Sequence, residues 1–215
     1  MTTENNKWPT YKDHLNKTYL EELAHKLWVT KGTRFTASQR LLTMNDLSNK
    51  SLGFLSAYMI IFSLLSVYQI QGTQLVNSNA VAFGSTALSI LILVFTQMEG
   101  AEDFKMRAHA LHQCALKISV LHDRIRSFKS LGKDIEDKKF DFCQNLSQEY
   151  QKILLEYPNH DSIDFDLFRI RHKQYYELGP WGVSNIWVRY YIRTKALYHV
   201  LITLPIPISI YLFFY

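Results

Sequence analysis

The sequence predicts an all-α membrane protein, built as a two-span transmembrane hairpin with long cytoplasmic helices. Residues 51–98 contain no Asp, Glu, Lys, Arg or His. A run of 48 such residues is long enough for two apolar helices of about 20 residues each and a short turn. Basic residues flank this run, and apolar residues recur at helical spacing beyond it. The alternative is a helical hairpin buried in a large soluble core.

This interpretation divides the chain into four regions. They are N-terminal cytoplasmic helices (1–50), the transmembrane hairpin (51–98), a cytoplasmic helical region with a heptad seam and an aromatic and basic juxtamembrane stretch (99–199), and a candidate third membrane segment (200–215). Within the first region, apolar spacing predicts helix from about 10 to 47, in two pieces broken near Gly32.

The two spans are expected at 52–70 and 80–98, joined by the uncharged turn 71–79. Each must be helical, because backbone groups in lipid can bond only within the chain. The turn has no basic residue, whereas both flanks do: Lys31, Arg34, Arg40, Lys50, Lys105 and Arg107. The positive-inside rule therefore predicts a multi-pass protein with its N-terminus in the cytoplasm.

Small residues mark positions where helices can approach closely in a membrane. They are Gly53, Ser56, Ala57 and Ser63 in the first span and Gly84, Ser85 and Ser89 in the second. Two uses remain open, namely packing within the hairpin and packing between protomers around a pore. Because neither span carries a charged residue, the sequence argues against a proton pump or a carrier of charged substrates.

The segment after the second span has apolar residues in alternating steps of three and four. They are Phe104, Ala108, Leu111, Ala115, Ile118 and Ile125, with His122 as the one polar member. This heptad pattern predicts a long helix with a seam for another helix, with a bend near Glu99 and Gly100. Two partners remain open, the N-terminal helix of the same chain or a second protomer, which predicts a homo-oligomer.

The remaining composition points away from catalysis. A third helix is expected at about 138–157, ended by Pro158. The two cysteines, Cys114 and Cys143, form no CxxC motif, and His109 and His112 lack a third ligand at metal spacing. No catalytic residue, cofactor site or metal site is therefore expected. The net charge of +5 suits an anionic bilayer surface better than a nucleic acid.

Two polar groups remain as candidate ligand or interface sites. The first is the cluster around His160 and Asp161, which follows a helix end where turns are common. The second is the stretch of aromatic and basic residues around Arg189 and Arg193, which are one helical turn apart. Such residues suit the lipid headgroup layer, but they also suit an anionic ligand or a protein core.

The last segment, 200–215, is uncharged but contains Pro205 and Pro207. Its length is short for a membrane span, and proline interrupts helical hydrogen bonding. Three interpretations remain open: a kinked third span, a re-entrant or surface segment, and burial in the cytoplasmic region.

Several motifs together resemble the SLATT family, the SMODS- and SLOG-associating two-transmembrane effectors. They are TKGTRFTASQRL (30–41), SAYMIIFSLLSVY (56–68), MEGAEDFKMRAHALHQCALKISVL (98–121), and Tyr157-Pro158-Asn159-His160 with Asp164. The last pattern resembles a reverse-transcriptase-associated subgroup. The resemblance covers about residues 12–200.

This resemblance implies a membrane effector of a prokaryotic anti-phage or conflict system. Such proteins are expected in the bacterial inner membrane, where they respond to a partner enzyme by oligomerising and permeabilising the bilayer, which ends in abortive infection. The implied partners are the lipid bilayer and a nucleotide second messenger or a reverse-transcriptase or nucleotidyltransferase type of enzyme. The alternative function is a membrane scaffold that recruits a soluble partner without making a pore.

Overall fold

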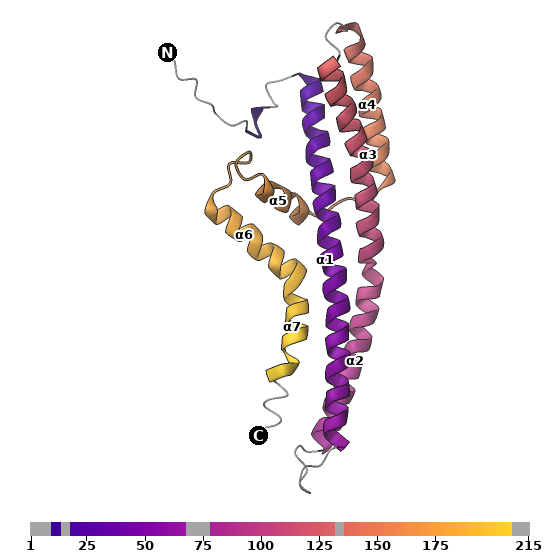
Figure 1. The fold of residues 1–215 in the computed structure, drawn as a ribbon, viewed down its shortest axis with the longest axis vertical. Coiled ribbons are helices and arrows are strands. Elements are labelled where there is room, and N and C mark those ends of the chain that lie inside the picture. Colours follow the sequence, from indigo (N-terminus) through magenta and orange to yellow (C-terminus); the bar gives the residue numbers. More distant parts are fainter. Residues whose placement is uncertain (1–9, 14–17, 68–77, 132–135, 208–215) are drawn as a thin grey trace. The chain divides into compact units, whose positions relative to one another are not determined.

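A computed structural model of the protein describes residues 10–13, 18–67, 78–131 and 136–207, and this part of the chain is helical with no strand. The elements are α1 (Tyr19–Val67), α2 (Ser78–Glu102), α3 (Phe104–Leu131), α4 (Glu136–Glu156), α5 (Ser162–Arg171), α6 (Pro180–Tyr191), the π-helix η2 (Ile192–Ala196) and α7 (Leu197–Thr203), shown in Figure 1. They form two compact units. We call these the bundle unit (Met1–Leu41 and Lys105–Tyr190) and the apolar unit (Leu42–Phe104 and Tyr191–Tyr215).

Helix α1 continues through Gly32, so the expected break there is wrong. Glycine disfavours a helix by only about 1 kcal/mol, which tertiary packing overcomes. The packing is visible at Gly32 itself, because a Cβ atom built there would lie 2.1 Å from Cε2 of Phe168 in α5. Gly32 is therefore the site where the ring of Phe168 lies directly on the helix backbone.

Three helices, α1, α3 and α4, form the core of the bundle unit. Their buried side chains make one cluster: Leu23, Leu27, Cys114, Ile118, Leu121, Ile125, Leu146, Tyr150 and Ile153. Polar contacts follow its rim, with Lys117 paired to Glu156 at 2.8 Å and Arg124 to Glu149 at 2.5 Å. The core therefore combines an N-terminal helix with two helices from the second half of the sequence.

The α5 helix is attached to α1 by aromatic packing. The ring of Trp28 meets Phe168 edge-on at 5.0 Å and His172 at 4.9 Å between centroids. Beyond α5, α6 buries Ile186 and leaves Trp181 and Trp187 exposed. An open groove of about 580 Å³ lies where the chain enters α6, lined by residues from Lys173 to Ser184.

The apolar unit joins parts of α1 and α2 to α7. The hydroxyl of Tyr198 donates to Glu99 Oε2 at 3.0 Å, and its ring meets Phe95 edge-on at 6.3 Å. The hydroxyl of Tyr58 donates to the carbonyl of Ile202 at 2.9 Å. These contacts tie α7 to the apolar helices. The first part of segment 200–215 thus packs in this unit, while 208–215 lies outside the described residues.

Within the described residues, one helical stretch, 81–130, is long and apolar enough to cross a membrane, and 11% of its most apolar window is buried. The second expected span, 80–98, lies in α2. The first expected span, 52–70, is described only to residue 67. Of the expected turn, 71–79, residues 71–77 lie outside the described residues. Asp103, with a φ of 43°, separates α2 from α3, so the bend falls after the expected Glu99 and Gly100.

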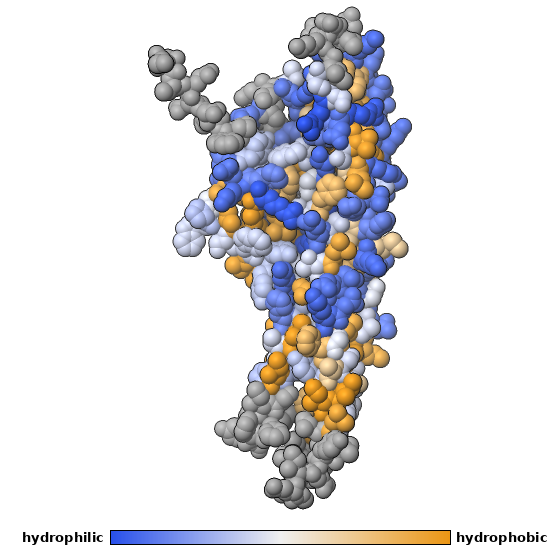
Figure 2. All heavy atoms as spheres, in the orientation of Figure 1, coloured by the Kyte–Doolittle hydropathy of each residue, from blue (hydrophilic) through white to orange (hydrophobic). Residues whose placement is uncertain are grey.

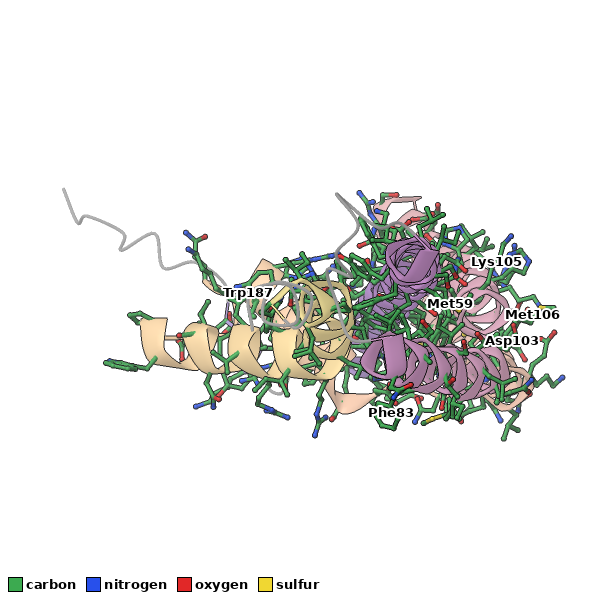
Figure 3. The ribbon with its side chains drawn as sticks, turned by 90° about the horizontal axis from the view of Figure 1, so that it is seen from below. Met59, Phe83, Asp103, Lys105, Met106 and Trp187 are labelled. Carbon is green, nitrogen blue, oxygen red and sulfur yellow. The ribbon has the colours of Figure 1, made fainter. Side chains whose placement is uncertain are left out.

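Apolar side chains on the apolar unit point outward. Examples are Phe83 (77%), Met98 (65%) and Leu93 (64%) on α2, and Ile60 (58%) on α1. Figure 2 shows hydrophobic residues gathered over this end of α1 and α2, and Figure 3 shows Phe83 at the edge of its helix. A surface of this kind is typical of a protein covered by lipid or by other protomers.

Candidate functional site

A buried ion-pair cluster in the bundle unit joins α1 to the start of α5. The guanidinium of Arg40 donates to both carboxylate oxygens of Asp164, from Nε at 2.6 Å and from Nη2 at 3.0 Å, and from Nη2 to Asp161 Oδ2 at 2.5 Å. Arg40 is 7% exposed, Asp164 is fully buried and Asp161 is half exposed. One cation therefore bridges a buried and an accessible carboxylate.

Local sequence places these carboxylates. Asp161 is the N-cap residue of α5, and its N–H donates to Asp164 Oδ2 at 3.0 Å, the reciprocal half of a capping box. Asp164 thus caps the helix and binds Arg40 with the same carboxylate. Because a charge-assisted bidentate pair is stronger and more directional than a neutral hydrogen bond, this contact fixes the start of α5 on α1.

Burial alone would lower the pKa of Arg40, since it disfavours the charged form. The hydrogen bonds and charges of Asp164 and Asp161 outweigh burial and raise the pKa of Arg40 above its ordinary value. The guanidinium therefore stays charged at every physiological pH.

A second buried arginine, Arg34, lies less than two turns before Arg40 on α1. Its guanidinium donates to the carbonyl of Pro158 and, at 3.3 Å, to Asn159 Oδ1. Both acceptors are neutral, and Arg34 is only 3% exposed with its Nε unpartnered among the described residues. The segment between α4 and α5 is therefore held by two arginines, and among the described residues Arg40 has carboxylate partners while Arg34 binds neutral acceptors.

His160 sits between these two arginine contacts. Its Nδ1 is buried without a partner among the described residues, and burial and the charge of Arg34 lower the pKa of His160 below its ordinary value. The ring is therefore neutral near pH 7. Of the expected ligand or interface residues, His160 and Asp161 thus lie together in this cluster.

The contacts of this cluster hold the segment between α4 and α5 against α1. The carboxylates of Asp161 and Asp164 are engaged with Arg40, and no nucleophile is positioned beside His160 by a described contact. Among the described residues, no three His, Cys, Asp or Glu side chains are grouped so as to hold a metal ion. The cluster therefore acts as a latch between α1 and the 158–164 segment.

The other two expected site residues, Arg189 and Arg193, lie in different helical elements. Arg189 pairs with Asp166 of α5 at 3.2 Å in the bundle unit. Arg193 falls in η2, after the end of α6, and in the apolar unit. A π-helix changes the angular spacing of successive residues, so a one-turn separation along the sequence no longer predicts a shared helical face.

The expected heptad seam is buried within a single chain. Ala108, Leu111, Ala115, Ile118 and Ile125 are each at most 3% exposed and Phe104 is 6% exposed. Cys114 and Leu121 were not part of the expected seam, but they pack with side chains of α1 and α4 in the same core. Packing within the chain is thus one use of the seam, and self-association through it stays a prediction.

The small residues of the two expected spans differ in their surroundings. Ser89 of α2 contacts α1, because its hydroxyl donates to Met59 Sδ at 3.2 Å, and Gly84 and Ser85 are half-buried. Gly53, Ser56, Ala57 and Ser63 of α1 are exposed, and no atom lies within 4 Å of a Cβ built on Gly53. The second span therefore packs within the unit, while the first presents an open small-residue face.

Sequence reasoning missed the roles of Arg34 and Arg40, which it counted only as basic flanking charges. A signal was present, because Asp161 and Asp164 have the three-residue spacing of a capping box and one such carboxylate commonly also binds a cation. The hydroxyl of Tyr198 and its partner Glu99 were also missed, since 99 residues separate them.

Comparison with known proteins gives one family match. The model of the SMODS and SLOG-associating 2TM effector domain family 5 matches residues 16–211. No curated protein and no solved structure matches this chain. The family is one of effector domains and not of known catalytic domains.

Proposed function

Because this chain belongs to the SMODS and SLOG-associating 2TM effector domain family 5, we propose that it is a membrane effector of a prokaryotic anti-phage system. On a signal from a partner enzyme it oligomerises and permeabilises the bacterial inner membrane, which ends in abortive infection. The chain is multi-pass, with two spans at 52–70 and 80–98 and its N-terminus in the cytoplasm. It acts without catalysis of its own.

The observation that carries this proposal is the exposed apolar surface of the apolar unit. Phe83, Leu93 and Met98 have little protein around them in a single chain. Leaving such side chains in water costs about 25 cal/mol for each Å² of apolar surface, so lipid or other protomers must cover them. The uncharged character of the same helices favours assembly between copies over a selective transport path.

The exposed face of Gly53 and Ala57 supports contact between protomers within the bilayer. Helices in lipid associate where small residues let their backbones approach closely. Gly53 and Ala57 are exposed, and among the described residues nothing lies within 4 Å of a Cβ built on Gly53. The corresponding face of α2 is already used by the contact between Ser89 and Met59. The first span is therefore the proposed contact between copies.

The Arg40 latch supplies a route for the signal. Arg40 and residue 52, where the first expected span begins, lie on the same helix, about three turns apart. A partner enzyme of the reverse-transcriptase or nucleotidyltransferase type, or a nucleotide second messenger, would act by competing for the arginines that hold the 158–164 segment. Release of that segment changes the packing on α1 and favours the oligomeric state.

The test is inducible expression in bacteria together with the neighbouring enzyme, with membrane potential followed by a voltage-sensitive dye. We expect depolarisation to precede growth arrest. Gly53→Leu should abolish depolarisation and oligomers recovered in detergent. Phe83→Leu, a matched change at an exposed apolar position of α2, should leave both intact.

Each outcome has a separate meaning. Growth arrest at unchanged membrane potential would refute the pore and favour the alternative function, a membrane scaffold that recruits a soluble partner. Depolarisation that survives Gly53→Leu would instead show that protomers meet through another surface.

A further inference from the structure

The α6 helix has an outward face that is apolar and aromatic. Ile186 is buried, whereas the side chains of Trp181 (89%), Val188 (53%) and Trp187 (50%) are exposed. Trp181 and Val188 lie on the side of the helix away from Ile186, and Trp187 lies on the flank between that side and Ile186. Trp181 and Val188 are seven residues apart and so lie on the same face, two turns along the helix. Figure 3 shows the position of Trp187 on the α6 ribbon.

The chemistry of this face matches the boundary layer of a bilayer. An indole ring has a large apolar area and one N–H donor, which is why tryptophan concentrates where lipid meets water. Neither ring is buried in the protein core, so both are available to contact lipid. Ser184, on the same side of the helix, also lines the open groove at the start of α6.

Charge points to the same occupant. From residue 178 to residue 215 the sequence has no Asp or Glu, whereas Arg189, Arg193 and Lys195 are basic. Arg189 keeps 43% of its side chain exposed while it pairs with Asp166. Such a segment is attracted to anionic headgroups by about 1 kcal/mol for each basic residue near the surface.

Chain length restricts where α6 can lie. Tyr191, its last residue, is nine residues from Val200, where the uncharged C-terminal segment begins, and the intervening residues are helical. At about 1.5 Å per residue, these residues cover about 13 Å. The end of α6 is therefore close to any membrane that takes up segment 200–215.

From these observations we propose that α6 is an interfacial helix, whose Trp181, Trp187 and Val188 insert into the headgroup boundary of an anionic bilayer. The inference rests on the membrane residence stated in the proposed function, but not on oligomerisation or pore formation. It assigns the aromatic stretch a lipid partner in place of an anionic small-molecule ligand or a second copy of the chain.

The experiment uses the full-length Val188→Cys protein, labelled with an environment-sensitive nitrobenzoxadiazole dye. It is reconstituted into vesicles of phosphatidylcholine and phosphatidylglycerol, with and without brominated acyl chains. Unmodified protein carried through the same labelling gives the background from Cys114 and Cys143, which are buried. Asn145→Cys, at an exposed position of α4, is the matched control.

A helix that lies about 5–10 Å into the boundary should bring the dye at position 188 into contact with the brominated chains. We expect its emission to fall about twofold with brominated lipid and the dye at 145 to be unaffected. Trp181→Ser should weaken quenching at 188, because it removes the largest exposed anchor of the face.

Three results would overturn the inference. The dye at 188 could be unquenched, it could be quenched no more than the dye at 145, or its emission could change with protein-to-lipid ratio at constant bromine content, which would identify a second copy as the occupant. Carbonate extraction of the same vesicles separates this from the proposed function. Protein that resists extraction with an unquenched dye refutes only the inference, whereas protein that is extracted refutes membrane residence itself.

Discussion

Removal of the charge on Asp164 should destabilise the bundle unit far more than removal of the charge on Asp161. Asp164 is fully buried and accepts two hydrogen bonds from Arg40, whereas Asp161 is 55% exposed and accepts one. Breaking a buried ion pair costs about 3–5 kcal/mol, because the remaining charge stays buried. Exposed pairs contribute about 0.2–1 kcal/mol.

Asp164→Asn is the informative change, because an amide oxygen can still accept the N–H of Asp161 and preserve the cap. We expect a loss of about 3 kcal/mol in the free energy of unfolding, near the lower end of the range because Asp161 still compensates Arg40. Asp161→Asn should cost less than about 1 kcal/mol. Urea denaturation in detergent micelles, followed by far-ultraviolet circular dichroism, measures both.

The double variant Arg40→Met with Asp164→Leu tests whether the cost of Asp164→Asn comes from the unpaired charge of Arg40. Replacing both charges by apolar side chains removes the desolvation cost along with the attraction, but it also removes the acceptor for the N–H of Asp161. Stability should therefore return to within about 1–2 kcal/mol of the parent protein, with the lost cap as the remaining cost. Equal costs for Asp164→Asn and Asp161→Asn would refute the view that burial sets the strength of this latch. A double variant as unstable as Asp164→Asn would do the same.

Two further predictions concern the same unit. Gly32→Ala should lower the free energy of unfolding by about 1–3 kcal/mol, because the added Cβ would collide with Phe168. Gly182→Ala, where nothing lies within 4 Å of the added Cβ, should raise it by up to about 1 kcal/mol. Thermal unfolding compares the two variants, and equal shifts of the melting temperature would contradict the packing at Gly32. Stability should also fall as pH is lowered through the ordinary histidine pKa of 6.5. Burial and Arg34 lower the pKa of His160 in the folded state, so the unfolded chain binds the proton first and is favoured. His160→Gln should reduce this slope in urea titrations between pH 7 and pH 5, and an unchanged slope would assign the effect to other groups.

The elements of this fold were predictable where one periodicity continued for many residues. The uncharged run of 51–98 and the steps from Ala108 to Ile125 predict helices that the described structure contains in α1, α2 and α3. The continuity of α1 through Gly32 was not predictable, because it depends on Phe168, 136 positions later in the sequence. Local patterns carry no information on such a partner.

The candidate site divides in the same way. His160 and Asp161 were identified as polar residues after a helix end, but their partner Arg40 lies 121 residues from Asp161. Arg189 and Arg193 fall in α6 and in the π-helix that begins at Ile192, a departure from regular spacing that the sequence did not indicate, and their role as a ligand or interface site stays a prediction. The sequence alone therefore did not reveal contacts between residues far apart in the chain, nor departures from regular helix geometry.

The buried seam restricts how copies of this protein can associate. Ile118, Leu121 and Ile125 are at most 1% exposed, and re-exposing each would cost about 2 kcal/mol. A second copy can therefore use this seam only by exchanging whole helices, which restores the same contacts.

Otherwise protomers of the bundle unit must meet elsewhere. A candidate is the outer side of α3, where Val120 (61% exposed) lies between the Lys117–Glu156 and Arg124–Glu149 pairs.

Two substitutions separate these routes. Ile118→Asp should unfold the bundle unit, since it places an unpaired charge in the core, so loss of oligomers in that variant proves nothing about the seam. Val120→Asp should change the free energy of unfolding by no more than about 0.5 kcal/mol, because the position is exposed. If Val120→Asp removes oligomers from cross-linked membranes at unchanged stability, copies meet through the outer side of α3. If oligomers persist, that side is excluded, and helix exchange or contact through the first span carries the assembly.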